Sequence, residues 1–413
     1  MKKNTRFSVT LRLLIVKMLV RKIGNPILRM SIISESQAQG LENTNASTSC
    51  TSGELIDNIG SLEYNELTHT LVAIFRNIRL KKIDRGVKKV NERVVEEKFA
   101  LLFQSNFGLD QEGLAFSLWT LSLPTVVIVH GCQEQLAWAT IIWDNICAKT
   151  DRKLFEVPKL LPWNRVVEAL TMKFRACTGR GLTMENLLYM FIKAHESKQP
   201  VPALNNRMIS FSQFCKETTQ QHSYTSWEWI YAILKITREH FQGPWIDESI
   251  IGFIDKSSAE NHLANCVPGT FLLRFPEIVL AGISIAWVHK EKDGQRQILH
   301  IQPFTAKDFV IRSLANRICD LDELKYLYPY IPKQEAFGRY TTSTIPPRHK
   351  DYVASELRTV LILDPTSNCI TDSPGTPNSG KSHDTSSSEY NWTSLDEMCG
   401  FEVDNISMFA PQD

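Results

Sequence analysis

The sequence predicts a multidomain fold in which a β-sandwich, an all-helical domain and an α+β domain are followed by a disordered tail. Apolar residues tend to alternate over residues 1–157, recur at helical spacing over 158–245, and mix both patterns over 246–345. The chain has 413 residues, more than a single hydrophobic core usually spans. From residue 364 the composition is acidic and rich in Ser and Pro, too polar to fold alone.

Residues 1–157 are predicted to form the β-sandwich, with basic loops. Phe7, Val9 and Leu11 alternate with polar residues, which is the period of two expected of a half-buried strand. Further runs of β-type residues, separated by turn residues, cover 71–80, 99–103, 114–123, 125–129 and 138–143.

The pattern then becomes helical. Over residues 158–245, Val166, Leu170 and Phe174 repeat at helical spacing, and Ser210 to Gln213 fits a capping box. Gly243-Pro244 is predicted to end the last helix of this domain. Over residues 246–345 we expect two helices that flank an antiparallel meander: a helix at 257–264, strands at 270–275, 282–288 and 297–301, and a helix at 307–318.

Composition excludes several functional classes. The nine cysteines are scattered, with no CxxC pair and no His cluster at ligand spacing, so neither a disulfide framework nor a metal site is indicated. We expect no cofactor. The apolar run 11–20 is about half the ~20 residues of a membrane span and contains Arg12 and Lys17, so no membrane insertion is expected.

The two ends of the chain carry opposite charge. Residues 1–29 hold eight Lys or Arg and no acid, whereas residues 364–413 hold nine acids and one Lys. A basic end suits a polyanion such as DNA, and an acidic end suits solvent or a protein partner. Taken alone, either charge run is explained more simply by ordinary solvated surface.

Arg274 interrupts the apolar strand Phe271 to Phe275. A buried guanidinium without a counter-ion costs several kcal/mol, so this residue needs an anion. One explanation is an internal salt bridge, and the other is a bidentate clamp for a phosphate of another molecule. Composition does not choose between them.

Several longer motifs carry a resemblance. PGTFLLRF, GISIAW, IQPFT and LKYLYP resemble the Src-homology-2 domain of the STAT family, the signal transducers and activators of transcription. RFSVTLRLLIVK, FRNIRLKKI, SLPTVVIVHG, ATIIWDN, RGLTMENL, FSQFCKE and WEWI resemble that family's DNA-binding and linker domains. The resemblance implies an immunoglobulin-like β-sandwich DNA-binding domain at 1–157, an all-α linker domain at 158–245 and an α+β Src-homology-2 domain at 246–345. A phosphotyrosine tail segment at 346–363 and an activation tail at 364–413 would follow.

The resemblance also implies a phosphotyrosine pocket. Arg274 would clamp the phosphate, Lys256 would be a second cationic contact, and Glu277 would lie in the following loop. The family usually has Ser directly after FLLRF, where its hydroxyl and backbone N–H bind phosphate oxygens. This chain has Pro276, which supplies neither donor, so a weaker or reshaped pocket is expected.

Tyr352 matches the family's activating tyrosine. Phosphorylation adds about −1.5 to −2 charges, which suits a pocket of Arg274 and Lys256. The twelve residues from Tyr340 to Tyr352 reach at most about 40 Å, enough of a tether for two chains to exchange tails with two-fold symmetry. The β-prone run 359–363 is a candidate for an added edge-strand contact.

DNA contacts are implied in the same way. His130 matches a position where many members have a base-contacting Asn, and Lys17 and Arg76 match positions that contact the DNA backbone. By itself, His130 is equally a loop or core histidine. A basic cluster is either a nuclear import patch or a solvated loop, and it consists of Lys81, Lys82, Lys88 and Lys89.

The resemblance implies a transcription factor that a Janus-type tyrosine kinase activates at phosphorylated receptor tails. The phosphorylated dimer would move from cytoplasm to nucleus with importins and bind palindromic TTC(N)GAA-type DNA. The alternative is a phosphotyrosine-binding adaptor or negatively acting short isoform, because the family's amino-terminal and coiled-coil domains have no counterpart before the first strand.

The tail contains one misleading match. Gly375 to Ser382 fits the P-loop pattern, but its polar flanks cannot supply the strand and helix that such a loop joins. With no nucleophile and base constellation beside it, an enzyme is not expected. Ser373 precedes Pro374 and is a candidate for proline-directed phosphorylation. Residues 398–409 resemble an activation segment or a plain disordered terminus.

Overall fold

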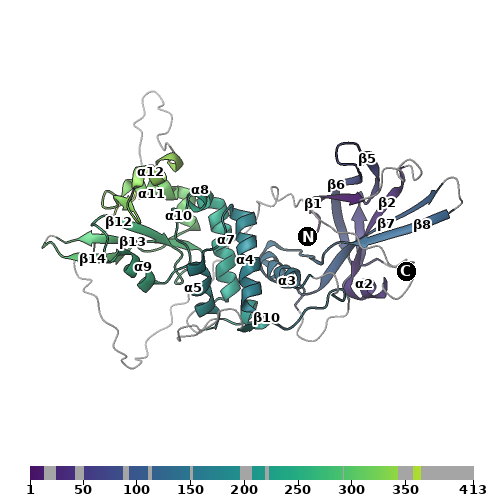
Figure 1. Cartoon of the computed structure of the whole chain (residues 1–413), viewed down its shortest axis with the longest axis horizontal. Helices are drawn as coiled ribbons and strands as arrows, with labels where there is room; N and C mark the ends of the chain where they lie inside the picture. The colour runs from purple at the N-terminus through teal and green to yellow at the C-terminus, as the bar shows by residue number, and fades with distance from the viewer. Residues whose placement is uncertain are drawn as a thin grey trace. The chain divides into compact units, whose positions relative to one another are not determined.

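The computed structural model describes residues 1–13, 25–41, 51–86, 93–109, 114–148, 152–195, 207–218, 223–291, 293–342 and 357–363. These residues form two compact units, one up to Pro158 and one from Lys159 onward. In Figure 1 the first unit is coloured purple to blue and the second teal to yellow.

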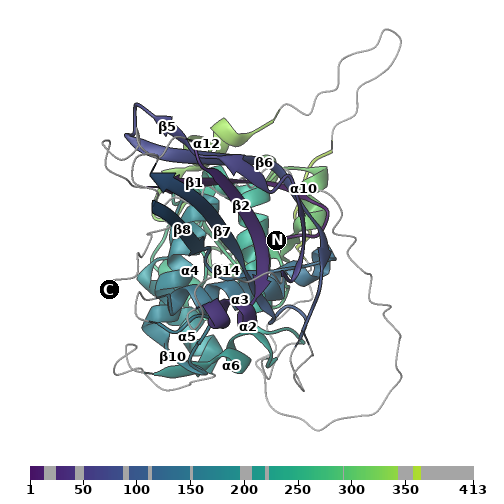
Figure 2. The same ribbon diagram turned by 90° about the vertical axis from the view of Figure 1, so that its right-hand side faces the viewer.

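The first unit is a sandwich of two antiparallel sheets. One sheet has the order β1 (Arg6–Leu13), β6 (Thr70–Ile83), β3 (Gly53–Ile56), with β5 (Glu63–Asn65) also paired to β6. The other has the order β4 (Ile59–Ser61), β2 (Ile27–Ser34), β7 (Lys98–Leu109), β8 (Leu114–Leu121), with β9 (Thr125–Val126) also paired to β7. Figure 2 shows β2, β7 and β8 side by side in the second layer.

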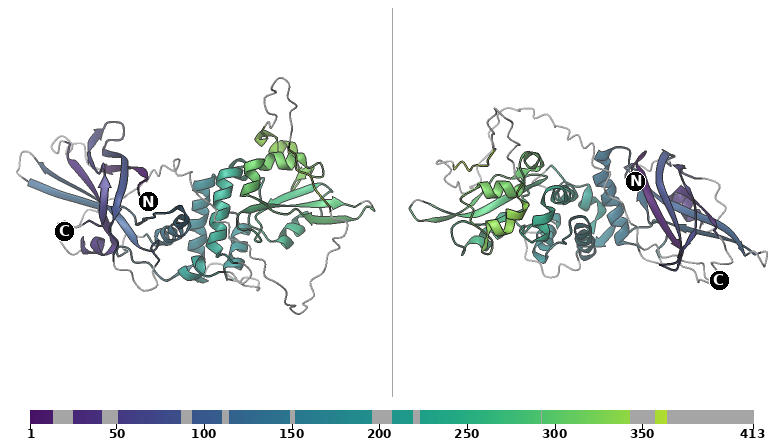
Figure 3. Two further views of the ribbon diagram at one scale, coloured as in Figure 1. Left: turned by 180° about the vertical axis from the view of Figure 1, so that it is seen from behind. Right: turned by 90° about the horizontal axis from the view of Figure 1, so that it is seen from above.

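Both sheets contribute to one core. The rings of Phe75 on β6 and Phe103 on β7 are 6.1 Å apart, and Leu11, Met30 and Leu80 are buried in the same cluster. Alternation along β1 leaves every second residue exposed, as the period of two predicted. Beyond the pairing with β2, strands β7 and β8 continue as a two-stranded ribbon (Figure 3).

The predicted strand at 138–143 is wrong, because these residues lie in helix α3 (Glu134–Ile146). Ala139, Ile142, Trp143 and Ile146 are buried at a spacing of three and four residues, which is a helical stripe. The β-prone Trp and Ile side chains suggested a strand, but periodicity outweighs residue preference here. A second helix, α2 (Glu35–Leu41), was not predicted and covers the outer face of β2 and β7.

The second unit begins with the helices α4 (Trp163–Thr178), α5 (Met184–His195), α6 (Phe211–Cys215) and α7 (Ser226–Ile236). A two-stranded sheet of β10 (Leu160–Pro162) and β11 (Met208–Ser210) accompanies them. The predicted capping box is confirmed: Ser210 Oγ accepts from the Gln213 N–H, and the Gln213 side chain accepts from the Ser210 N–H.

Gly243-Pro244 does not end the helical run. After α7 the chain makes a π-helical turn (Thr237–Phe241) and continues through α8 (Gln242–Ile246), which contains both residues. Pro244 stands in the first turn of α8, where its missing N–H removes no helical hydrogen bond. The proline that was predicted to end a helix therefore lies in the first turn of the next one.

The rest of the unit has the predicted layers. Strands β14 (Arg296–His300), β13 (Gly282–Lys290) and β12 (Thr270–Arg274) form the antiparallel meander, and α9 (Lys256–Leu263) packs on it through Ala259 and Leu263. The predicted single helix at 307–318 is instead two, α10 (Ala306–Ile311) and α11 (Leu314–Asp320). Arg312 is extended between them, and Ser313 caps the second. Strands β15 (Phe304–Thr305), β16 (Tyr326–Leu327) and β17 (Ile331–Pro332) and helix α12 (Lys333–Phe337) complete it.

The helical part and the α+β part share one aromatic core. Phe253 contacts Phe174 on α4, Trp229 on α7 and Phe275 after β12, with ring centroids 5.7, 5.0 and 5.1 Å apart. Trp245 contacts Phe275 at 5.7 Å. A shared core of this kind fixes the helices against the loop that follows β12.

Candidate functional site

Arg274, the last residue of β12, is 8% exposed. Its backbone is held by Ser284 on β13 and by a bridge to Gly252. Among the described residues its guanidinium donates one hydrogen bond, from Nη1 to the Ile254 carbonyl at 3.3 Å, and its Nε has no partner. A guanidinium carries five N–H donors, so most of this capacity is unused.

Arg312 provides a comparison within the same fold. It is also 8% exposed, but its Nε and Nη2 donate to both carboxylate oxygens of Asp320, at 2.6 and 2.5 Å. Burial lowers the pKa of Arg274, while Asp255 and Glu260 oppose that shift from a distance without pairing with it. Within the described residues the internal salt bridge at Arg274 is therefore missing, which favours an anion from another molecule.

Lys256 lies on the helix that packs against β12, the strand that ends at Arg274. It is the first residue of α9, behind the capping residue Asp255, and its side chain is 65% exposed. Lys256 and Arg274 both act electrostatically on His300, the last residue of β14. The structure thus brings the two predicted cations together, one from a helix and one from a strand.

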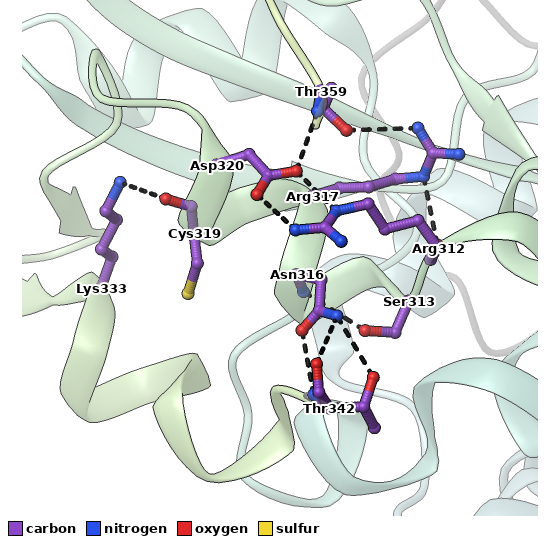
Figure 4. Close-up of polar contacts among 9 residues, drawn as sticks. All are labelled: Arg312, Ser313, Asn316, Arg317, Cys319, Asp320, Lys333, Thr342 and Thr359. Atoms are coloured by element: carbon purple, nitrogen blue, oxygen red, sulfur yellow. Dashed lines mark hydrogen bonds and ion pairs between the residues drawn. The ribbon is translucent and has the colours of Figure 1, made fainter. Parts of the chain in front are cut away.

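Thr359, in the described segment 357–363, contacts α11 (Figure 4). The Thr359 N–H donates to Asp320 Oδ2 at 2.8 Å, and Arg317 Nη1 donates to Thr359 Oγ1 at 3.4 Å. At the other end of the tail, Asn316 exchanges hydrogen bonds with the Thr342 backbone at 2.9 and 3.0 Å. Residues 359–363 form no strand here, and Tyr352 lies outside the described residues.

The candidate DNA contacts lie on the first unit. Arg76 is exposed on β6, and His130 is exposed in the loop after β9. Gln133 fixes that loop by accepting from the Val129 and His130 N–H groups at 2.8 and 3.2 Å, and the Lys3 N–H donates to the Ile128 carbonyl at 2.9 Å. Lys17 lies outside the described residues.

The basic cluster is partly neutralised where it is described. Lys81 pairs with Glu54 at 2.9 Å and Lys82 with Asp84 at 2.7 Å. Lys88 and Lys89 fall outside the described residues, as do Ser373 and the P-loop match at 375–382. The part of the chain that the structure describes contains no cluster of His, Cys, Asp or Glu placed to hold a metal ion and no helix able to cross a membrane.

Comparison with known proteins agrees with the order of the three parts of the chain. Three family models match in order: "STAT protein, DNA binding domain" at residues 1–128, "Signal transducer and activator of transcription, linker domain" at 150–230, and "SH2 domain" at 250–328. A signal transducer and transcription activator from Anopheles gambiae is 61% identical over 419 residues. The chain belongs to the STAT family. The match covers 100% of the chain and 58% of that relative's length.

In this STAT chain the loop after β12 is held by the linker helices. Trp229 Nε1 on α7 donates to the Pro276 carbonyl at 3.1 Å, and the Tyr224 hydroxyl donates to the Glu277 carbonyl. Burial raises the pKa of Tyr224 to about 12, so its hydroxyl stays protonated and keeps donating at neutral pH. Pro276, which lacks the donors usual at this position, is thus fixed through its carbonyl.

Glu277 faces the linker with its side chain. Its carboxylate accepts from the Tyr189 hydroxyl and lies 2.8 Å from Lys193 Nζ, both on α5. Burial raises the pKa of Glu277 and lowers that of Lys193. The carboxylate of this predicted pocket residue is therefore engaged by α5. The sequence gave no sign of these loop contacts, and Trp229 entered it only as part of the WEWI motif.

Proposed function

We propose that this chain is the portion of a STAT transcription factor that binds phosphotyrosine, dimerises through it and binds DNA. The observation that carries the proposal is Arg274, a buried arginine with one hydrogen bond and no internal counter-ion among the described residues. A phosphate supplies the two negative charges and the acceptors that such a guanidinium lacks. The chain acts by binding and needs no cofactor.

In this scheme a Janus-type kinase phosphorylates Tyr352 at an activated receptor. The phosphate of each chain then binds Arg274 and Lys256 of the other, with Glu277 contributing its backbone N–H. Such an exchange is two-fold symmetric. The contact of Thr359 with α11 supports it, because it places a residue that follows Tyr352 on the surface of the domain that would bind the phosphotyrosine. Phosphorylation of Ser373 is proposed as a separate, proline-directed modification.

A two-fold dimer matches a palindromic DNA site such as TTC(N)GAA, with one half-site for each sandwich. We assign Arg76 and Lys17 to phosphate contacts and His130 to a base edge. Entry into the nucleus from the cytoplasm would use importins. The adaptor function remains the competing assignment, and it predicts phosphopeptide binding without DNA binding.

A mobility-shift assay separates the two. The phosphorylated chain should shift a palindromic site and not a scrambled one, and the unphosphorylated chain should shift neither. The Arg274→Ala chain, treated with the same kinase, is the matched control and should not shift the site. Phosphopeptide binding by a phosphorylated chain that leaves the palindrome unshifted would support the adaptor instead.

A further inference from the structure

A carboxylate on α9 lies close to the cations that are candidates for phosphate binding. Glu260 Oε1 on α9 accepts a hydrogen bond from His300 Nε2 at 3.1 Å, and the same oxygen is 4.0 Å from Lys256 Nζ. Glu260 also attracts Arg274. One carboxylate therefore faces three groups that can bear positive charge.

The imidazole of His300 is largely buried, and one of its nitrogens lacks a hydrogen-bond partner among the described residues. Its side chain is 15% exposed, and its Nδ1 is buried without a partner in the described residues, as is Nε of Arg274. Its neighbour across the ladder on β13 is Ala286, which does not titrate. The groups that face the ring are thus Glu260 and Lys256 from α9 and Arg274 from β12, with Asp255 acting on Arg274.

The charge on His300 depends on what fills the pocket. Burial lowers its pKa, and the nearby charges of Arg274 and Lys256 lower it further against the opposing effect of Glu260. The ring is therefore neutral at pH 7 when the pocket is empty. A phosphate dianion would offset both cations and remove the repulsion that keeps the ring neutral.

We propose that Glu260 is an internal stand-in for phosphate, and that phosphotyrosine displaces it and binds His300 as a protonated third cation. Glu260 is 40% exposed at its side chain and can turn into solvent when displaced. One proton from solvent then enters the imidazole as the phosphate binds. The inference rests on the proposed phosphotyrosine binding and adds to it a ligand and a proton.

The proposal predicts a pH dependence with a definite sign. Between about pH 8 and 6.5 the affinity for phosphopeptide rises as the pH falls, by up to about tenfold per pH unit if one full proton is taken up. Below about pH 6 the phosphate itself becomes protonated and affinity declines again. A pocket without a titrating cation would show a flat affinity from pH 8 to 6.5.

Calorimetry on the whole chain tests this with a peptide of residues 347–363 phosphorylated at Tyr352. Measuring in buffers of different ionisation enthalpy gives the protons bound per peptide. The wild type should take up a large fraction of a proton at pH 7. His300→Asn should bind with a flat pH profile and no uptake, and Glu260→Gln should bind several-fold more tightly at pH 8 while still taking up a proton.

The matched control for His300→Asn is a substitution of another histidine in the same domain. His262→Asn changes another half-buried histidine, which pairs with Glu185 at 2.8 Å, and should leave the uptake unchanged. Thermal unfolding verifies that each variant is folded. Phosphorylation-dependent binding without proton uptake in the wild type would overturn this inference alone. No phosphorylation-dependent binding at all would overturn the proposed function and the inference with it.

Discussion

Replacing Arg274 with Met should abolish phosphopeptide binding and at the same time stabilise the fold. The substitution keeps a long apolar stem and removes a buried charge that has one hydrogen bond, to the Ile254 carbonyl. An unsatisfied buried donor costs about 1–3 kcal/mol, more when charged, and only one modest hydrogen bond is lost in exchange. We therefore expect the free energy of unfolding to rise by about 1–3 kcal/mol.

Arg312→Met is the matched control, because Arg312 has the same exposed fraction and a carboxylate that it binds with two nitrogens. Removing it leaves the largely buried Asp320 carboxylate with the Thr359 N–H but without its cation, which should lower the free energy of unfolding by about 3–5 kcal/mol. The midpoints of urea unfolding for the two variants should thus move in opposite directions from the wild type. Equal destabilisation by both would refute the reasoning, since it would mean that Arg274 has a structural partner.

Three further predictions concern other parts of the chain. In the phosphorylated dimer, Arg76→Ala should weaken binding to all DNA sequences and flatten the salt dependence of that binding. His130→Ala should instead reduce the difference in binding free energy between palindromic and scrambled sites by ~1–3 kcal/mol per lost contact. Binding curves on both sites at several salt concentrations test the two variants. Trp229→Phe should lower phosphopeptide affinity several-fold by releasing the loop after β12, while Trp163→Phe, whose indole N–H has no partner in the described residues, should not, as calorimetry can show. Burial raises the pKa of Asp320, but hydrogen bonds from Arg312 and the Thr359 N–H outweigh it and hold that pKa below its ordinary value. The folded pKa is the lower one, so the contact of Thr359 should persist from neutral pH through the ordinary Asp pKa of about 4 and be lost only as the pH falls further, as the Thr359 amide resonance would report.

Much of the fold could be predicted because local patterns coincide with burial. The alternation in β1 and the interrupted apolar strand at Arg274 each depend on residues close together in sequence. The capping box at Ser210 is a four-residue signal, and it is present in the structure. Such local patterns predict structure well because the side chains that form them lie within one turn or one strand.

The errors arose where tertiary contacts decide. Residues 138–143 are rich in β-prone side chains, but they form a helix because the buried stripe of α3 has helical spacing. Gly243-Pro244 resembles a stop, yet the aromatic contacts of Trp245 with Phe174 and Phe275 continue the helical run. The helical spacing in α3 could have been read from the sequence, whereas the contacts of Trp245 join residues that are far apart along the chain.

The same limit applies to the candidate site: residues that meet only through packing leave no pattern in the sequence. Arg274 is conspicuous by itself, whereas His300 and Glu260 meet only when β14 is packed beside α9. The linker contacts to the loop after β12 join residues that are far apart in sequence, such as Trp229 and Pro276. A single sequence holds no pattern that pairs them.

The mass of the phosphorylated chain in solution tests the central claim most directly. Kinase-treated wild type should sediment at twice the 47.1 kDa of one chain. Tyr352→Phe lacks the phosphate acceptor and Arg274→Ala lacks the pocket, so both should stay at the mass of one chain under the same treatment. A kinase-dependent dimer that survives in either variant would contradict the proposed exchange of phosphotyrosine between Tyr352 and Arg274.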